Sequence, residues 1–144
     1  MRTVKDILRA KGSKVYSIAP DATVYEALKR MAKKNVGAML VFEGTDLVGL
    51  ISERDYSRKT ILKGRLSKET AVREIMTTEM VTVHPDDDIE GCMELFTDKH
   101  VRHLPVIEKG KVVGIVSIGD IVKSIIDYKE FIIAELESYI KGKR

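Results

Sequence analysis

The chain has 144 residues, with 25 Lys and Arg against 22 Asp and Glu, and a formal net charge of +3. Apolar residues make up 44% and charged residues 33%, a balance typical of a folded globular domain and not of a disordered chain. The small net charge argues against a nucleic-acid-binding protein. No apolar run is long enough to cross a membrane. The single cysteine, Cys92, excludes an internal disulfide and favours the cytoplasm.

The sequence repeats itself at an offset of 65 residues. Residues 20–55 align with residues 85–120 without a gap, and ten of these 36 positions are identical. Similar lead-in segments precede them, at 4–8 and 72–76. Such internal similarity predicts two related units. We therefore expect a first repeat with its lead-in over 1–62, a linker over 63–71, a second repeat over 72–127 and a helical extension over 128–144.

Taken in chain order, each unit shows the same elements. A short β-branched strand leads through a Pro-Asp turn into a helix whose apolar residues recur at i, i+3, i+4 and i+7. Thr23 with Glu26 predicts a capping box for the first helix, and Asp88 an N-cap for the second. Two further strands and a second helix, starting near Ser52 or Ser117, complete the unit. The expected strands are Val15–Ile18, Ala38–Phe42, Leu47–Ile51, Val81–Val83, Leu104–Ile107 and Val112–Val116.

These patterns predict an α+β fold of two β-α-β-β-α units. Neither unit has enough apolar surface to stand alone, so the two sheets should pack against each other. The last helix is long, because apolar residues keep a helical spacing from Ile121 to Ile140. Its surplus apolar surface has two candidate covers, a helix from a second chain or its own domain.

The string Gly49-Leu-Ile-Ser52-Glu-Arg-Asp55 returns as Gly114-Ile-Val-Ser117-Ile-Gly-Asp120. In one interpretation Ser-x-x-Asp is only a capping box that satisfies the helix start. In the other, the helix N-terminus faces an anion such as phosphate, and the Asp accepts hydrogen bonds from ribose hydroxyls. The recurrence of the whole string and the nearby basic residues favour the second interpretation.

The chain resembles a pair of CBS domains and is similar to stand-alone CBS-pair proteins. The resemblance lies in the paired strings, in the segment from Arg102 to Val106, and in the strand starts at Ser17-Ile18 and Thr82-Val83. The resemblance implies a pseudo-two-fold sandwich with two clefts, a homodimer, and binding of an adenosine nucleotide of the AMP, ADP, ATP or NAD class, or S-adenosylmethionine, with no catalytic cofactor.

The resemblance also implies roles for individual residues. Asp55 and Asp120 would hold ribose hydroxyls, with Ser52 and Ser117 beside the ribose-phosphate. One adenine slot would be lined by Ile18, Ala38 and Met39, and the other by Val83, His103 and Leu104. The phosphate candidates are Arg54, Arg58, Arg102 and His103. Gly37-Ala38 stands where the second unit has Arg102-His103, so the two clefts should differ in charge.

Three functional hypotheses follow. The first is a regulatory sensor of adenosine nucleotides that signals to a separate effector protein. The second is an interaction scaffold in which both Ser-x-x-Asp motifs are helix caps and the C-terminal helix binds a partner. The third is a nucleotide-processing enzyme, for which no nucleophile, base or metal cluster stands out. His84, His100 and His103 lack metal-ligand spacing, and Cys92 falls on a buried helical stripe.

Overall fold

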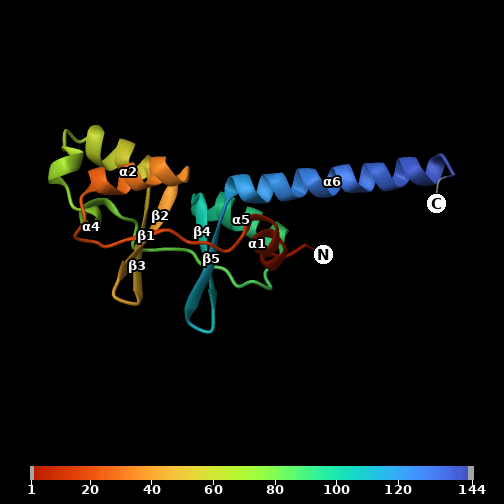
Figure 1. The fold of residues 1–144 in the computed structure, drawn as a ribbon, viewed down its shortest axis with the longest axis horizontal. Helices are drawn as coiled ribbons and strands as arrows, with labels where there is room; N and C mark the ends of the chain where they lie inside the picture. Colours follow the sequence, from red (N-terminus) through yellow and green to blue (C-terminus); the bar gives the residue numbers. More distant parts are fainter. Residues whose placement is uncertain (1, 143–144) are drawn as a thin grey trace.

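The computed structural model describes residues 2–142 and shows two similar units side by side, with one long helix leaving the second (Figure 1). In chain order the elements are α1 (Val4–Lys11), β1 (Ser17–Ile18), α2 (Val24–Lys34), β2 (Ala38–Glu43), β3 (Asp46–Ser52), α3 (Glu53–Tyr56), the π-helix η1 (Ser57–Ile61), the 3₁₀-helix η2 (Ser67–Glu69), α4 (Val72–Ile75), α5 (Ile89–Lys99), β4 (His103–Glu108), β5 (Lys111–Ser117) and α6 (Ile118–Ile140).

The hairpins of the two sheets have equivalent registers. The first has the order β1-β2-β3, with β1 parallel to β2 and β2 antiparallel to β3, and β4 pairs with β5 in the second. Ala38 pairs with Ser52, and 65 residues later His103 pairs with Ser117. Both Ser-x-x-Asp motifs therefore begin at the same place, where the second strand of a hairpin ends beside the start of the first.

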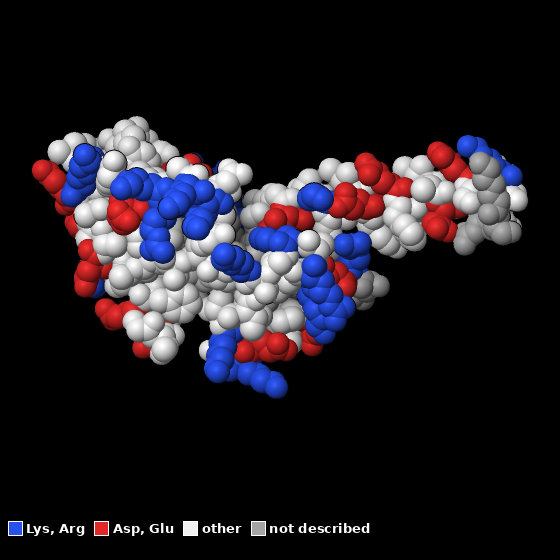
Figure 2. Space-filling model, viewed as in Figure 1, with Lys and Arg blue, Asp and Glu red and all other residues white. Residues whose placement is uncertain are grey.

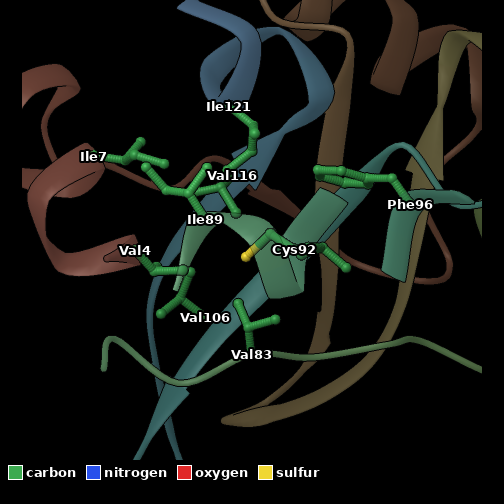
Figure 3. Close-up of a cluster of buried hydrophobic side chains, with 10 residues drawn as sticks. Val4, Ile7, Val83, Ile89, Cys92, Phe96, Val106, Val116 and Ile121 are labelled. Carbon is green, nitrogen blue, oxygen red and sulfur yellow. The ribbon is translucent and has the colours of Figure 1, made fainter. Parts of the chain in front are cut away.

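The predicted packing of sheet against sheet is confirmed. Each unit has an apolar core between its sheet and its helices, and Figure 3 shows the core of the second unit, with Cys92 and Phe96 from α5 facing Val106 and Val116. A third cluster joins the units, because Leu40 and Leu50 pack with residues of β5 such as Ile115. The α+β fold of two repeats stands as predicted.

The two lead-in helices are exchanged between the units. The backbone amides of Val4 and Lys5 in α1 donate to the carbonyls of Asp87 and Pro85 in the second unit, both over 2.9 Å. In the equivalent way, α4 of the second lead-in lies on the first unit, where the Val72 amide donates to the Ala22 carbonyl over 2.8 Å. The chain therefore crosses from one unit to the other twice, through residues 12–16 and 76–81.

Two local features differ from the sequence-based expectations, and a third agrees with them. The strand predicted at Val81–Val83 forms only an isolated bridge from Val83 to Val106. Pro105 has no amide to donate to it, whereas in the first unit the Leu40 amide donates to the Tyr16 carbonyl over 3.1 Å. The Thr23 hydroxyl accepts the Glu26 amide over 3.1 Å, but no reciprocal bond completes the capping box. The Asp88 cap is confirmed by a 2.7 Å bond from the Gly91 amide.

The long C-terminal helix is confirmed as α6, which spans 23 residues. Its first turns pack on the second unit, where Ile121 and Ser124 are buried, and the rest extends away from the domain (Figure 1). It does not fold back on its own domain. The last two residues of the predicted extension, 143 and 144, lie outside the described residues. Within residues 2–142, no helix is long and apolar enough to span a membrane.

Candidate functional site

Both Ser-x-x-Asp motifs form complete capping boxes. The Ser52 amide donates to Asp55 Oδ2 over 3.0 Å, and the Asp55 amide donates back to Ser52 Oγ over 3.2 Å. The corresponding bonds between Ser117 and Asp120 measure 2.9 and 3.1 Å. These bonds fix the two carboxylates at the starts of α3 and α6. The capping role is therefore real, and it leaves part of each carboxylate for other contacts.

A lysine pairs with each of these carboxylates. Lys59 Nζ lies 3.2 Å from Asp55 Oδ1, one helical turn away in the same unit. Lys11 Nζ lies 2.7 Å from Asp120 Oδ2 and also donates to the Ile115 carbonyl over 3.0 Å. Lys11 comes from α1, so this ion pair joins opposite ends of the sequence. Among the described residues, Oδ1 of Asp120 has no hydrogen-bond partner.

Two clefts open beside these carboxylates, and each is built from both units. Cleft 1, of about 450 Å³, combines the first crossing and the end of α2 with the second Ser-x-x-Asp motif. It is lined by Lys11, Gly12, Lys14, Tyr16, Lys34, Asn35, Val36, Gly37, Ala38, His103, Ile115, Ser117 and Asp120. Cleft 2, of about 330 Å³, is lined by Leu50, Ser52, Arg54, Asp55, Thr77, Glu79, Met80, Val81, Lys99, His100, Val101, Arg102 and His103. Most positions correspond through the offset of 65, so the clefts are pseudo-symmetric.

Aromatic and cationic groups distinguish cleft 1. Tyr16 occupies the position that Val81 has in cleft 2, and the amines of Lys14 and Lys34 each lie 5.5 Å from the centre of its ring. Lys and Arg gather on this face over the end of α2 (Figure 2). In cleft 2 the position of Lys14 is taken by the acidic Glu79. Cleft 1 therefore offers a ring face with ammonium groups around it.

Arginines distinguish cleft 2. Arg54 lies close enough to Arg102 and Arg58 for the three charges to interact, and partial burial together with these two neighbours lowers the pKa of the Arg54 guanidinium. Crowded guanidinium groups of like charge favour an anion between them. As predicted, the first unit contributes less charge from its Gly37-Ala38 strand start.

His103 lines both clefts. Burial lowers the pKa of its imidazole below the ordinary value of 6.5, and the Asp120 carboxylate offsets part of this effect. The ring is therefore predominantly neutral at pH 7 and can accept or donate one hydrogen bond.

The structure brings together most of the predicted site residues and separates the others. Ala38, Ser117 and Asp120 line cleft 1, His103 lines both clefts, and the second cleft takes Ser52, Arg54, Asp55 and Arg102. Four predicted adenine-slot residues, Ile18, Met39, Val83 and Leu104, are buried in the cores of the units, and Arg58 lies outside both linings.

Several lining residues were not predicted, chiefly Lys11, Lys14 and Tyr16 in cleft 1 and Glu79 in cleft 2. All lie on the two crossings or at the end of α1. The available signal was the offset itself, which places Lys14 opposite Glu79 and Tyr16 opposite Val81 just before the Pro-Asp turns.

Other candidate chemistry has no support in the described part of the chain. No group of three or more His, Cys, Asp or Glu side chains within residues 2–142 is arranged to hold a metal ion. Cys92 is fully buried, and burial raises the pKa of its thiol to about 11.

The comparisons with known proteins agree over both repeats. The sequence profile of the CBS domain matches residues 4–60 and 72–127. The mitochondrial CBS domain-containing protein CBSX3 of Arabidopsis thaliana is 40% identical over 149 residues, which cover 97% of this chain and 72% of that protein.

Two solved structures have the same fold. A signal-transduction protein with CBS domains from Burkholderia ambifaria MC40-6 is similar with a TM-score of 0.85 and 47% identity, over 87% of this chain and 94% of that chain. The CBS domain pair of protein MJ0100, solved in complex with 5-methylthioadenosine and S-adenosyl-L-methionine, has a TM-score of 0.77 and 25% identity, over 89% of this chain and 98% of that chain.

Proposed function

The chain belongs to the CBS-domain family, whose domain pairs are regulatory modules, and we propose that it senses adenosine nucleotides in its two clefts. The observation that carries this proposal is the pair of pseudo-symmetric clefts, each with a capping-box carboxylate and several cations on its wall. The complex of the related pair with two adenosine compounds supports the class of ligand.

Cleft 1 has a group for each part of a nucleotide. Oδ1 of Asp120 can accept hydrogen bonds from the paired hydroxyls of a ribose. The ring of Tyr16 offers a face on which a purine can stack. The ammonium groups of Lys14 and Lys34, beside that ring, and of Lys11, beside Asp120, can neutralise phosphates.

The charges of the clefts suggest different ligands. Cleft 1 carries three lysines and one carboxylate, whereas cleft 2 carries Arg54, Lys99 and Arg102 with the two carboxylates of Asp55 and Glu79. We therefore propose that ADP, ATP or NAD favours cleft 1 and that AMP suffices for cleft 2. In this proposal the protein is not an enzyme, uses no catalytic cofactor, and transmits ligand binding to a separate effector protein in the cytoplasm.

Thermal unfolding with AMP, ADP, ATP, NAD and S-adenosylmethionine tests the function. A ligand at roughly 100 times its Kd adds about 2.7 kcal/mol of stability, which raises Tm by roughly 5–10 °C for a chain of this size. Asp120→Asn should abolish the part of the ligand-induced rise in Tm that comes from cleft 1, and Asp55→Asn the part that comes from cleft 2. Each substitution removes a carboxylate but keeps a side-chain oxygen that can accept the capping hydrogen bond. Asp86→Asn, whose carboxylate pairs with Lys5 outside both clefts, is the control.

A second candidate function is a scaffold without a nucleotide ligand, and the exposed apolar surface of α6 favours it. In that case no adenosine compound raises Tm at millimolar concentration. The Asp55→Asn and Asp120→Asn variants then lose only the stability that the capping box gives to the start of the helix. The same titrations therefore separate the two functions.

A further inference from the structure

A small groove lies between α1 and the first turns of α6, two helices that are side by side in the second unit (Figure 1). Its volume is about 140 Å³, which is too small for a nucleotide and large enough for a small ion. It shares Lys11 and Asp120 with cleft 1. The other residues on its walls, chiefly Arg2, Lys123, Ser124 and Asp127, line neither cleft.

Two buried polar groups on the walls of this groove have no partner within residues 2–142. Ser124 is only 6% exposed, and its Oγ makes no hydrogen bond. A serine inside a helix often donates to the carbonyl four residues earlier, but Ser124 does not. The Nε of Arg2 is also buried and has no acceptor in the same part of the chain. Buried polar groups are normally satisfied, so these two atoms indicate a partner from outside the chain.

The chemistry of the two groups defines that partner. The Nε–H of Arg2 can only donate a hydrogen bond, and the Ser124 hydroxyl can donate one as well. Arg2 is held in place, because its carbonyl accepts the Ile89 amide over 3.2 Å and its guanidinium lies 5.9 Å from the centre of the Tyr128 ring. A planar guanidinium matches the geometry of a carboxylate or a phosphate. The missing partner is therefore an acceptor with several oxygens.

The charges around the groove favour an anion. Asp120 is paired with Lys11 over 2.7 Å, and Asp127 with Lys123 over 3.3 Å. Each carboxylate on the wall thus already has an ammonium beside it. Arg2 is the third cation, so the walls carry one positive charge more than they carry negative charges.

The first unit has a side chain where the second has this groove. The offset of 65 places Lys59 at the position of Ser124. Lys59 Nζ pairs with Asp55 and donates to the carbonyl of Ile75, the lead-in residue equivalent to Ile7 on the groove wall. In the second unit a serine replaces this lysine, and Lys11 of α1 reaches Asp120 instead. The open groove is therefore a property of the second unit and not of the repeat.

We propose that this groove binds a small oxyanion such as inorganic phosphate, held by the Arg2 guanidinium, the Ser124 hydroxyl and the Lys11 ammonium. The anion also acts on cleft 1, because it draws Lys11 away from Asp120 and so frees this carboxylate for a ribose. This coupling rests on the proposed function, whereas the anion site itself does not.

Titration with sodium phosphate, compared with sodium chloride at the same ionic strength, tests the site without any nucleotide. In ¹H–¹⁵N spectra the Nε–H signal of Arg2 should shift and saturate at millimolar phosphate. Arg2→Gln should raise the phosphate Kd, measured from the rise in Tm, by more than about tenfold, because it removes a charged donor. Ser124→Ala should also weaken phosphate binding, yet it should not lower Tm in the absence of phosphate, because it removes an unpaired buried hydroxyl.

Arg9→Gln is the matched control, since it removes the same charge from an exposed position of α1 outside the groove. It should keep the wild-type phosphate Kd. Ser124→Lys, which gives the second unit the lysine of the first, should abolish phosphate binding. A signal of Arg2 that does not saturate with phosphate would overturn the proposal, and so would equal phosphate Kd values for Arg2→Gln and Arg9→Gln.

Calorimetric titration of adenosine with and without saturating phosphate tests the coupling. Phosphate should lower the adenosine Kd of the wild-type protein severalfold and leave that of Arg2→Gln unchanged. An adenosine Kd that is the same with and without phosphate in the wild type would contradict the coupling alone. A complete lack of adenosine binding would overturn both the coupling and the proposed function, and the phosphate titration would still decide whether the groove is an anion site.

Discussion

At the scale of single residues, the contact between Lys11 and Asp120 has two opposing effects on a ligand. The ammonium of Lys11 lies 2.7 Å from the carboxylate that would bind a ribose, so it competes with neutral hydroxyl groups. The same ammonium attracts the phosphates of a nucleotide. A nucleoside and a nucleotide should therefore respond differently to its removal.

Replacing Lys11 with Met should raise the affinity of cleft 1 for adenosine relative to ATP. The substitution frees Asp120 for the ribose and takes one positive charge from the phosphates. Calorimetric titration with both ligands measures the ratio of the Kd for adenosine to the Kd for ATP. Lys5→Met, on the same helix but paired with Asp86 outside the cleft, should leave the ratio unchanged. Equal shifts for adenosine and ATP would contradict this account of Lys11.

His103 should make the stability of the protein depend on pH. Its pKa in the folded protein lies below the ordinary 6.5 because the ring is buried. Between the lowered pKa and 6.5 the unfolded chain binds more protons at this residue, so the stabilising contribution is complete above pH 6.5 and is lost as the pH falls through the folded pKa. In urea titrations, His103→Gln should show a smaller loss of unfolding free energy on acidification than the wild type. If His103→Gln keeps the wild-type pH dependence, the imidazole of His103 is not the group responsible.

At the scale of elements, the glycine of each repeated string is explained by the exchanged lead-in helices. A Cβ on Gly114 would lie 2.7 Å from the Leu8 side chain of α1, and one on Gly49 would lie 2.6 Å from the sulfur of Met76. Leu8 and Met76 hold the same place in the two lead-ins. The glycines let these side chains lie directly on the strands that lead to Asp55 and Asp120.

Gly114→Ala should therefore destabilise the protein by about 1–3 kcal/mol, the usual cost of overpacking. Leu8→Ala in the same chain should remove most of that cost, because it vacates the space that the new methyl group needs. Urea unfolding of the single and double variants gives the coupling energy. Gly119→Ala is the control, since its Cβ would meet nothing closer than 3.6 Å. Additive effects at Gly114 and Leu8 would contradict this packing.

Local patterns were sufficient to predict the elements but not all of the site. The order of strands and helices follows from hydrophobic periodicity, and the Ser-x-x-Asp carboxylates follow from the repeat. Side chains alternate along a strand, so Ala38 and Leu40 face the other unit while Met39 and Val41 face the helices of their own. That alternation separates Met39 from Ala38, although they are neighbours in the sequence. Lys11 and Tyr16 depend on the exchange of helices, which no local pattern encodes.

At the scale of the whole molecule, the exchange makes each unit depend on a segment that belongs in sequence to the other. Ile7 of α1 is buried in the core of the second unit, and Ile75 of α4 in the core of the first. The stability of either unit should therefore be sensitive to a substitution outside its own repeat.

Ile7→Ala should cost about 2–5 kcal/mol, as large-to-small changes in a core do. Hydrogen exchange should show the loss of protection first in β4 and β5, although residue 7 belongs in sequence to the first repeat. Ile75→Ala should lower protection first in β2 and β3. Loss first in the strands of the repeat to which each helix belongs in sequence, β2 and β3 for Ile7→Ala and β4 and β5 for Ile75→Ala, would contradict the exchange of helices.

The two crossings also decide what would happen if the chain were cut. A break in the exposed loop around residue 64 leaves two fragments, each carrying the helix that the other requires, so the pair should reassemble as a split protein. Because both clefts are lined by the crossings, a bound nucleotide would act as a clamp between the fragments. Complementation would then report ligand binding directly, without any effector protein.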